Sequence, residues 1–293
     1  MRALVAGSAG QLGRELLARL GDEVAWEGGR TELDVTDGAA VAALVARVRP
    51  DVVFNATAFN RVDAAEAEPL AAFAVNAAGP HFLARAARDA GALLVHVSTD
   101  YVFSGDSERP YREEDPPEPR SEYGRSKLEG ERRVLAASAS NLVVRTSWVF
   151  GRGRNFLAAI LAQAQARRGG QASGPLRVVD DQRGKPTWAV DLATAIRRLV
   201  DRGANGLYHV AGSGVATWWE VARLCLDEAG CADLEIERIR TAELDLPAPR
   251  PAWSVLDCSK AEALGVHMRD WREAVRGYLR SEDSPLRAEM AVR

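Results

Sequence analysis

The sequence predicts an α/β protein, a doubly wound parallel sheet with a smaller α/β lobe. Three observations support this fold class. Short apolar runs alternate with helix-compatible stretches along the first half of the chain, which is typical of parallel sheets with helices on both faces. A glycine-rich turn, residues 7–13, follows the first apolar run. Hydroxyl and carboxyl side chains follow a later run, at the strand end where open α/β sheets bind their ligands.

The bulk composition excludes several classes of protein. A chain of 293 residues is long enough for one large α/β domain and a smaller lobe. The net charge of -3 and the pI near 5.9 give no reason to expect a nucleic-acid partner. No apolar run approaches the ~20 residues that span a bilayer, and the chain begins directly with a strand, so we expect neither a membrane partner nor a signal peptide.

The three cysteines predict the compartment of the protein. Cys225, Cys231 and Cys258 have no metal-ligand spacing, and they cannot all pair within one chain. Reduced thiols are the rule in the cytosol. We therefore expect a cytoplasmic protein.

The glycine-rich turn predicts a dinucleotide site. Residues 3–6 are expected to form a buried strand, and residues 14–20 continue as an amphipathic helix. Gly7 permits the tight turn, Gly10 lets the backbone approach a pyrophosphate, and Gly13 allows the helix to pack closely on the strand. Free N–H groups at the start of such a helix bind phosphate. Strand, turn and helix come in the order that a Rossmann-like NAD(P) site requires.

The region after the second predicted strand, residues 23–26, carries charges that favour opposite cofactors. Glu27 lies twenty residues after Gly7, where an acidic side chain can bind the ribose hydroxyls of NAD. Arg30 can instead receive the 2′-phosphate of NADP, and an ordinary polar loop is the alternative for both residues. We predict that NADPH and NADH both serve. Thr36 or Asp37 is expected to cap the following helix.

Residues 51–55 and 93–98 are predicted to be the third and fourth strands. Ala56 and Ala58 follow the third strand, and their small size suits backbone that lies beside a cofactor. Thr99 follows the fourth strand, at the ligand-binding edge of the sheet.

Residues 70–90, between these strands, have a helical pattern. This helical region contains Asn76, which needs a hydrogen-bond partner if it is buried.

Tyr123 and Lys127 lie four residues apart, so they share one face if the segment is helical. A free phenol has a pKa of about 10, and a nearby ammonium lowers that pKa. The pair can therefore make a general acid or base out of the tyrosine. An isolated pair of this kind is more often a surface aromatic and a solvated charge. The glycine turn and the strand that ends at Thr99 favour the catalytic interpretation.

The second half of the chain alternates less regularly. Residues 104–121 are predicted to be a proline-rich loop, either solvated surface or the mouth of a substrate pocket. We expect a NAD(P)-binding domain over residues 1–147 and a mainly substrate-binding lobe over 148–293, with some strands returning to the main sheet. The expected elements are strands at 141–146, 176–182 and 206–210, helices at 155–168, 190–202 and 218–229, and two short terminal helices.

These motifs resemble the extended branch of the short-chain dehydrogenase/reductase superfamily. Over nearly the whole chain, the sequence is similar to the dTDP-4-dehydrorhamnose reductase family, which completes dTDP-L-rhamnose synthesis. The most specific matching segments are STDYVF at 98–103, YG followed by KLEGE at 123–131, and RTSWV at 145–149. Supporting segments are GSAGQLG at 7–13, VD and AEAEP at 62–69, DQ, G and PT at 181–187, and RP and LD at 250–257.

The resemblance implies an oxidoreductase in which hydride passes from NADPH or NADH to the C4 keto group of dTDP-4-dehydro-L-rhamnose. Tyr123 would protonate the alkoxide, Lys127 would hold the nicotinamide ribose, and Thr99 would bind the carbonyl. The implied cofactor contacts are Gly7, Gly10, Gln11, Leu12, Gly13, Arg30, Asp34, Val35, Ala56, Ala58, Asn76, Tyr123 and Lys127. The implied contacts to the nucleotide sugar are Asn60, Val62, Thr99, Asp100, Trp148 and Arg250, although Trp148 can equally be a core aromatic.

The resemblance bears on metal binding and assembly as well. Some members of the family hold Mg²⁺ at a subunit interface with acidic side chains, which implies a homodimer. This chain keeps Glu15, but Val190 stands where another acid is expected. We therefore predict no metal site and no need for added divalent metal.

Three other functions are alternatives to the reductase. Dehydratases follow the threonine of the fourth strand with Asp-Glu, whereas this chain has Asp100 and Tyr101, which disfavours a lyase. Epimerases and reductases of other sugar nucleotides share much of the pocket and remain open. A non-catalytic regulator is the third, since the regulatory β-subunit of methionine adenosyltransferase resembles this family. Against it, Thr99, Tyr123 and Lys127 are all present.

Overall fold

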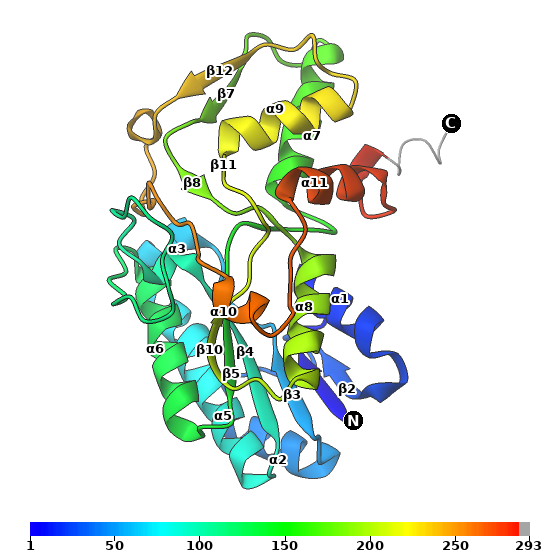
Figure 1. Ribbon diagram of the computed structural model, residues 1–293, viewed down its shortest axis with the longest axis vertical. Helices are drawn as coiled ribbons and strands as arrows, with labels where there is room; N and C mark the ends of the chain where they lie inside the picture. Colours follow the sequence, from blue (N-terminus) through cyan, green and yellow to red (C-terminus); the bar gives the residue numbers. More distant parts are fainter. Residues whose placement is uncertain (287–293) are drawn as a thin grey trace.

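A six-stranded parallel sheet organises the computed structural model, which describes residues 1–286 (Figure 1). Residues 287–293 of the predicted second lobe lie outside the described residues. The strand order is β2-β1-β3-β4-β5-β10, so the chain reverses its direction of winding between β1 and β3. Ligands bind beside such a switch point, at the carboxyl ends of the strands. The strands are β1 (Ala3–Ala6), β2 (Val24–Gly28), β3 (Val52–Asn55), β4 (Leu93–Thr99), β5 (Leu142–Thr146) and β10 (Gly206–His209).

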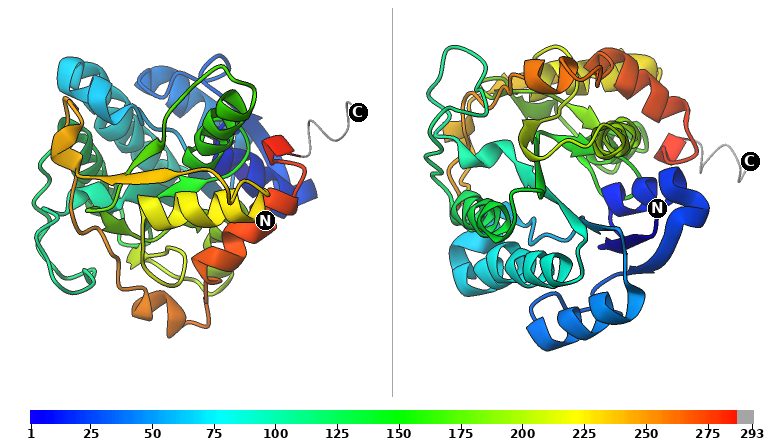
Figure 2. Two further views of the ribbon diagram at one scale, coloured as in Figure 1. Left: turned by 90° about the horizontal axis from the view of Figure 1, so that it is seen from above. Right: turned by 60° about the horizontal axis from the view of Figure 1, so that its bottom comes forward.

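Helices cover both faces of this sheet (Figure 2). In β1, Ala3 and Val5 belong to a core shared with α1 and α8, whereas Leu4 and Ala6 belong to a core shared with α2 and α5. Successive strand residues face opposite sides, so a strand buried on both faces is continuously apolar, as β1 is. The sheet is therefore doubly wound, as predicted. These helices are α1 (Gln11–Leu20), α2 (Gly38–Val48), α5 (Gly79–Asp89), α6 (Glu122–Ala137) and α8 (Ala189–Asp201).

Side-chain caps fix where several helices begin. The Asp37 carboxylate accepts hydrogen bonds from two backbone N–H groups of α2, which confirms one of the two predicted caps. Ser121 caps α6 by accepting from the Gly124 N–H. The predicted helical region 70–90 is present, but a π-helical turn, Ala74–Ala78, interrupts it between α4 (Pro69–Phe73) and α5. This turn contains Asn76.

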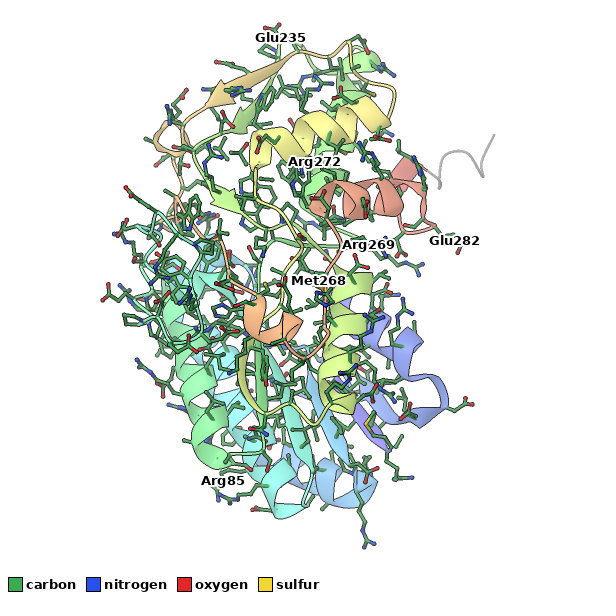
Figure 3. All side chains as sticks on the ribbon, viewed as in Figure 1. Arg85, Glu235, Met268, Arg269, Arg272 and Glu282 are labelled. Carbon is green, nitrogen blue, oxygen red and sulfur yellow. The ribbon has the colours of Figure 1, made fainter. Side chains whose placement is uncertain are left out.

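A second layer of small elements covers the carboxyl edge of the sheet, at the top of Figure 1. It has its own apolar core, in which α7, α9 and α11 pack together. In Figure 3, Glu235 marks the outer end of this layer and Arg85 the opposite end of the molecule. The elements of this layer are β6 (Val149–Phe150), α7 (Phe156–Arg168), β7 (Leu176–Val179), β8 (Arg183–Gly184), β9 (Thr187–Trp188), β11 (Ala216–Thr217), α9 (Trp218–Glu228), β12 (Ile236–Ile239) and α11 (Trp271–Arg280). Two short helices belong to the main domain, where α3 (Val62–Ala67) packs against α6 and α10 (Ser259–Glu262) against β10.

The strand predicted over residues 176–182 ends earlier, at Val179. The next two side chains bind other segments, since Asp180 accepts a hydrogen bond from Thr217 and Asp181 accepts from Thr241.

One strand of the second half of the chain belongs to the main sheet. Although β10 follows Trp148 in the chain, it pairs with β5 at the edge of this sheet.

Residues 104–121 form an ordered loop without a helix, as predicted. The Tyr111 ring stacks on Phe103 at a centroid distance of 4.1 Å, and the Tyr111 N–H donates to the Val255 carbonyl at 2.8 Å. These contacts attach the loop to a segment far away in the sequence.

The helix α6 lies unusually close to the π-helical turn at Gly130. A Cβ atom at this position would lie only 2.1 Å from the backbone oxygen of Asn76. A backbone carbonyl within a packed helix cannot move aside easily, so any side chain would push α6 away from the turn.

We expect Gly130→Ala to lower the free energy of unfolding by about 1–3 kcal/mol, the usual cost of overpacking. The control is Gly38→Ala, where the new Cβ would meet only the side chain of Phe82. Urea denaturation of both variants measures the difference. Equal stability of Gly130→Ala and the native protein would contradict this close packing.

Candidate active site

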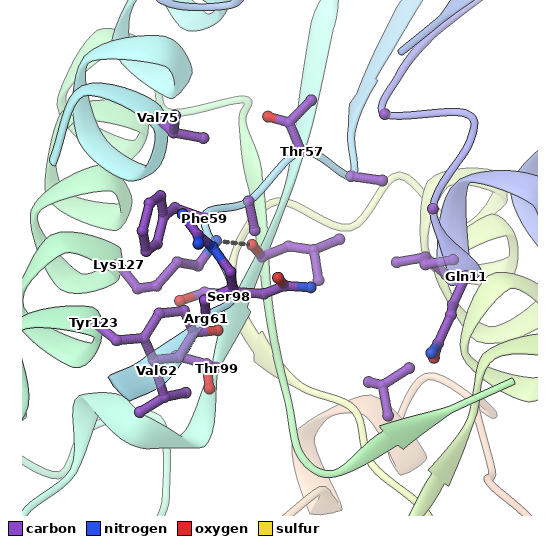
Figure 4. A pocket seen from close by; sticks show the side chains of 18 of the residues that line it. Gln11, Thr57, Phe59, Arg61, Val62, Val75, Ser98, Thr99, Tyr123 and Lys127 are labelled. Carbon is purple, nitrogen blue, oxygen red and sulfur yellow. Dashed lines mark hydrogen bonds between the residues drawn. The ribbon is translucent and has the colours of Figure 1, made fainter. Parts of the chain in front are cut away.

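A cavity of about 1060 Å³ lies at the carboxyl ends of β1, β3 and β4 (Figure 4). Ligand pockets usually measure ~300–1,000 Å³, so this cavity is at the upper end of that range. Of the residues expected to bind cofactor or substrate, most line it. They are Gly7, Gly10, Gln11, Leu12, Arg30, Asp34, Val35, Ala56, Ala58, Asn60, Val62, Thr99, Asp100, Tyr123, Lys127 and Trp148.

The glycine-rich turn has the geometry that its sequence predicts. Gly7 has a φ of +86°, and a Cβ there would lie 2.8 Å from the carbonyl carbon of Ala56. Gly13 lies outside the cavity lining. A Cβ on it would lie 2.1 Å from the Gly7 oxygen, so only a residue without a side chain lets α1 pack on the turn. No side chain caps the first turn of α1. Its N–H groups therefore remain available for a phosphate.

Arg30 lines the cavity, whereas Glu27 does not. Glu27 is an exposed residue of β2. It precedes a turn in which Glu32 accepts a hydrogen bond from the Gly29 N–H at 2.7 Å. Asp34, also in the lining, accepts from the N–H and hydroxyl of Thr36, and these bonds lower the pKa of Asp34. Arg30 is therefore placed to meet a ligand in the cavity, whereas Glu27 is not.

Tyr123 and Lys127 reach the cavity from α6, opposite the end of β4 (Figure 4). The Lys127 ammonium donates a hydrogen bond to the Val97 carbonyl at 2.6 Å. The Thr99 hydroxyl donates to the Asp100 carboxylate at 3.0 Å, and the Tyr123 side chain lies near Thr99 in the same cavity. The ring of Tyr101 meets that of Tyr123 edge-on, at a centroid distance of 5.6 Å.

Burial dominates the proton equilibria of both side chains on α6. It raises the pKa of Tyr123 to about 12, and hydrogen bonding to Thr99 opposes the rise. Burial also lowers the pKa of Lys127 to about 8, while the charge of Glu131 opposes the fall. Burial thus outweighs any effect of Lys127 on the Tyr123 phenol, and the expected fall in its pKa is not seen. Removal from water penalises the phenolate and the ammonium alike.

Asp100 holds the hydroxyl groups around it. Its side chain is only 2% exposed, and its two oxygens accept hydrogen bonds from Thr99 and Ser147, the latter at 2.8 Å. Burial raises the pKa of this carboxyl group, and the hydroxyl donors oppose the rise. Although Asp100 borders the cavity, its oxygens are engaged by protein, and it fixes the position of Thr99.

Two stacked indoles form another wall of the cavity. Trp148 and Trp218 lie parallel, with ring centroids 3.7 Å apart. Trp148 has a φ of +46°, a conformation that bulky side chains rarely adopt. Gly184 lies directly against this ring, and a Cβ there would come within 2.4 Å of it. The Trp218 N–H donates to Gln182 at 3.1 Å.

Sequence reasoning missed Trp218. The tandem Trp218-Trp219 at a helix start was the available signal, but only the structure tells which indole lines the cavity.

Asn76, expected to bind cofactor, lies outside the cavity lining and is fully buried. Its carboxamide accepts from the Phe59 N–H at 2.8 Å and donates to the Phe59 carbonyl at 3.0 Å and the Ser126 hydroxyl at 2.9 Å. The side chain thus ties the loop after β3 to α6. Its capacity for hydrogen bonds is used by protein, so the expectation of direct contact with the cofactor needs correction.

Arg250, expected to bind substrate, is also outside the lining. Its guanidinium pairs with Asp63 at 2.7 Å and donates to the Ala248 carbonyl at 2.9 Å. Asp63 follows Val62, which does line the cavity. Arg250 therefore contacts the loop beside the cavity rather than the cavity itself.

The acidic side chains do not assemble a metal site. Among residues 1–286, no three His, Cys, Asp or Glu side chains lie close enough together to hold a metal ion. Asp283 lies near Glu15, and burial together with this neighbouring charge raises the pKa of Glu15. Val190 packs at the edge of an apolar cluster instead of supplying a third carboxylate. Glu15 and Asp283 therefore have no third carboxylate at position 190, and independence from added metal stays a prediction. The helices of the described part are all too short or too polar to cross a membrane.

We expect Asn76→Leu to lower the free energy of unfolding by about 1–3 kcal/mol, because it leaves buried polar groups of Phe59 unpaired. Asn60→Leu is the matched control, since Asn60 is exposed in the cavity wall. Both variants are measured by urea denaturation and by NADPH binding. A loss of NADPH affinity at unchanged stability for Asn76→Leu would show instead that this side chain binds the cofactor.

Comparison with known proteins agrees with this geometry. The family model described as the RmlD substrate-binding domain matches residues 1–283. A dTDP-4-dehydrorhamnose reductase of Streptomyces griseus is 42% identical and covers 94% of this chain and 91% of its own. A crystal structure of a dTDP-4-dehydrorhamnose reductase from Clostridium acetobutylicum has a TM-score of 0.90 at 35% identity, covering 95% of this chain and 98% of its own. A Bacillus anthracis dTDP-4-dehydrorhamnose reductase in complex with NADP has a TM-score of 0.88 at 32% identity, with the same coverage. The chain belongs to the RmlD substrate-binding domain family.

Proposed function

We propose that the protein is an NADPH-dependent sugar-nucleotide 4-ketoreductase that converts dTDP-4-dehydro-L-rhamnose to dTDP-L-rhamnose. The observation that carries this proposal is that Thr99, Tyr123 and Lys127 share one cavity with the glycine-rich turn. A hydride acceptor held by the hydroxyl groups would therefore lie beside a bound dinucleotide. The names of the relatives at about 40% identity support the same reaction.

The chain's own residues prepare the cofactor site. When bound, NADPH supplies the hydride. Gly7 and Gly10 allow the backbone to approach the pyrophosphate, and the uncapped first turn of α1 donates N–H groups to it. Arg30 would pair with the 2′-phosphate, because it is the basic residue of this loop that lines the cavity. Lys127 would donate to the nicotinamide ribose in place of the Val97 carbonyl.

Proton delivery follows from the state of Tyr123. With a pKa raised to about 12, its phenol is protonated at neutral pH and can donate. Thr99 and Tyr123 would both hydrogen-bond the substrate carbonyl, and Tyr123 would give its proton to that oxygen as hydride reaches C4. Lys127, with a pKa of about 8, is mostly charged at pH 7 and would stabilise the phenolate that remains.

The second layer of the molecule is proposed to bind the sugar nucleotide. Trp148 and Trp218 offer apolar rings to one side of the ligand, and Asn60 and Val62 line the cavity from the loop after β3. On this proposal, residues 1–147 mainly hold the cofactor and residues 148–293 mainly hold the substrate. A cytoplasmic location is part of it, because the three cysteines are free and buried. The homodimer stays a prediction.

The deciding experiment supplies NADPH and dTDP-4-dehydro-L-rhamnose together. We expect stoichiometric oxidation of NADPH, with dTDP-L-rhamnose identified by NMR. Formation of an epimer without NADPH consumption would indicate an epimerase. Binding of NADPH without turnover of this or related 4-keto sugars would indicate a regulatory protein.

Tyr123→Phe tests the proton donor. The substitution keeps the ring but removes the hydroxyl group, so kcat should fall by about 10²–10⁴-fold, the usual contribution of general acid catalysis. NADPH affinity should change little. Thr99→Val should behave similarly, whereas Lys127→Met should lose both turnover and NADPH affinity. Fluorescence titration and steady-state kinetics measure the two quantities. Near-native kcat in Tyr123→Phe would show that the proton comes from another group.

Arg30→Ala tests cofactor choice. The sequence predicts use of both cofactors, and the position of Arg30 in the cavity adds a preference for NADPH. Loss of one charged hydrogen-bonding group should lower kcat/KM for NADPH by about 10–100-fold and leave NADH unaffected. Arg47→Ala, on the exposed surface of α2, is the control. An equal loss with both cofactors would contradict the role of Arg30.

A further inference from the structure

Glu131 lies one helical turn beyond Lys127 on α6, at the same spacing that separates Lys127 from Tyr123. These three side chains therefore follow one face of the helix. This face is turned to β4, where the Val97 carbonyl accepts from Lys127 and the Ser98 hydroxyl donates to Glu131. The helix is thus attached to the strand at two points, and Tyr123 lies one turn before them.

The contacts of Glu131 are the most extensive of the three. Its side chain and that of Arg145 are each 3% exposed. One carboxylate oxygen accepts from the Ser98 hydroxyl at 2.5 Å and from Arg145 Nε at 2.9 Å, and the other accepts from Arg145 Nη2 at 2.7 Å. Two parallel bonds of this kind fix both groups in one geometry. Since Arg145 belongs to β5 and Ser98 to β4, Glu131 joins the helix to two strands.

Few charges act on the Lys127 ammonium. On β4, His96 is fully buried, and its pKa lies well below the usual value because of burial and the nearby ammonium, so it is neutral. On α6, Tyr123 is a neutral phenol at physiological pH. The Arg145 guanidinium on β5 faces Glu131. Among the described residues, Glu131 is the charge that favours the ammonium of Lys127.

We propose that Glu131 is a positioning residue, which holds α6 in register on β4 and β5 and keeps the neighbouring Lys127 side chain charged for cofactor binding and turnover. Its effect on turnover rests on the proposed function, whereas its effect on NADPH binding does not need the sugar substrate. Glu131 touches neither cavity nor ligand, because it is absent from the cavity lining and its oxygens are bonded to Ser98 and Arg145.

The test follows NADPH affinity against pH by fluorescence titration. Affinity should weaken as pH rises through the pKa of Lys127, about 8, because the neutral amine binds the ribose less well. The part of this pH profile over which affinity falls is called the basic limb. It should disappear in Lys127→Met, which shows that it reports the titration of Lys127. In Glu131→Gln the limb should move to lower pH by about one pH unit, the effect of losing one nearby opposite charge.

Arg145→Met should shift the limb in the opposite direction. It leaves the Glu131 carboxylate without its guanidinium partner, so the ammonium of Lys127 is favoured more strongly and the limb should move to higher pH. Damage to packing alone would move both variants in the same direction. Glu129→Gln is the control, because Glu129 pairs with Arg133 on the partly exposed side of α6, and it should leave the limb in place.

Each outcome decides the proposal. Opposite shifts in Glu131→Gln and Arg145→Met support it, and a limb that stays in place or shifts the same way in both overturns it. If one of these two variants does not fold, the other decides alone, by a shift to lower pH in Glu131→Gln or to higher pH in Arg145→Met. An unmoved limb there also overturns the proposal. Failure of the native protein to reduce the sugar nucleotide would refute only the proposed function.

Discussion

The docking of α6 on the carboxyl end of β4 is the contact on which the rest of the site depends. Gly130 lets the helix approach the π-helical turn, and the buried pair of Glu131 with Arg145 connects the helix to the sheet. Breaking one partner of a buried pair is costly, typically ~3–5 kcal/mol, because the other charge is left unpaired. The same docking brings Tyr123 beside Thr99 and Lys127 beside the Val97 carbonyl. One interface thus determines both stability and the geometry of the site.

Burial gives this site its chemical character. It favours the neutral phenol of Tyr123, which is the form that donates a proton, and it disfavours the ammonium of Lys127. A site that needs a charged lysine at neutral pH must therefore contain a compensating charge, and the Glu131 carboxylate has the position and sign to provide it. Asp100 has a positioning role as well, since its buried oxygens accept hydrogen bonds from Thr99 and Ser147 and so orient these hydroxyl groups.

Local sequence signals predicted much of the fold and part of the site. The approach of Gly13 to Gly7 and the cap at Asp37 involve residues close together in the sequence, and the structure reproduces their geometry. Asn76 and Arg250 were harder, because their partners Phe59 and Asp63 lie far away in the sequence and occupy groups that a ligand would otherwise use. The placement of Trp218 beside Trp148 likewise depends on how α9 packs against α7 and α11 in the second layer. Side-chain pairing between distant segments cannot be deduced from spacing.

The central claim is that hydride passes from the nicotinamide to C4 of the sugar in this cavity, beside Thr99 and Tyr123. The most direct measurement uses NADPH carrying deuterium at the transferable position of the nicotinamide, with the 4-keto sugar nucleotide as substrate. NMR and mass spectrometry of the product should find one deuterium, at C4 of the sugar. Product with no deuterium, or with deuterium at another sugar carbon, would contradict the account.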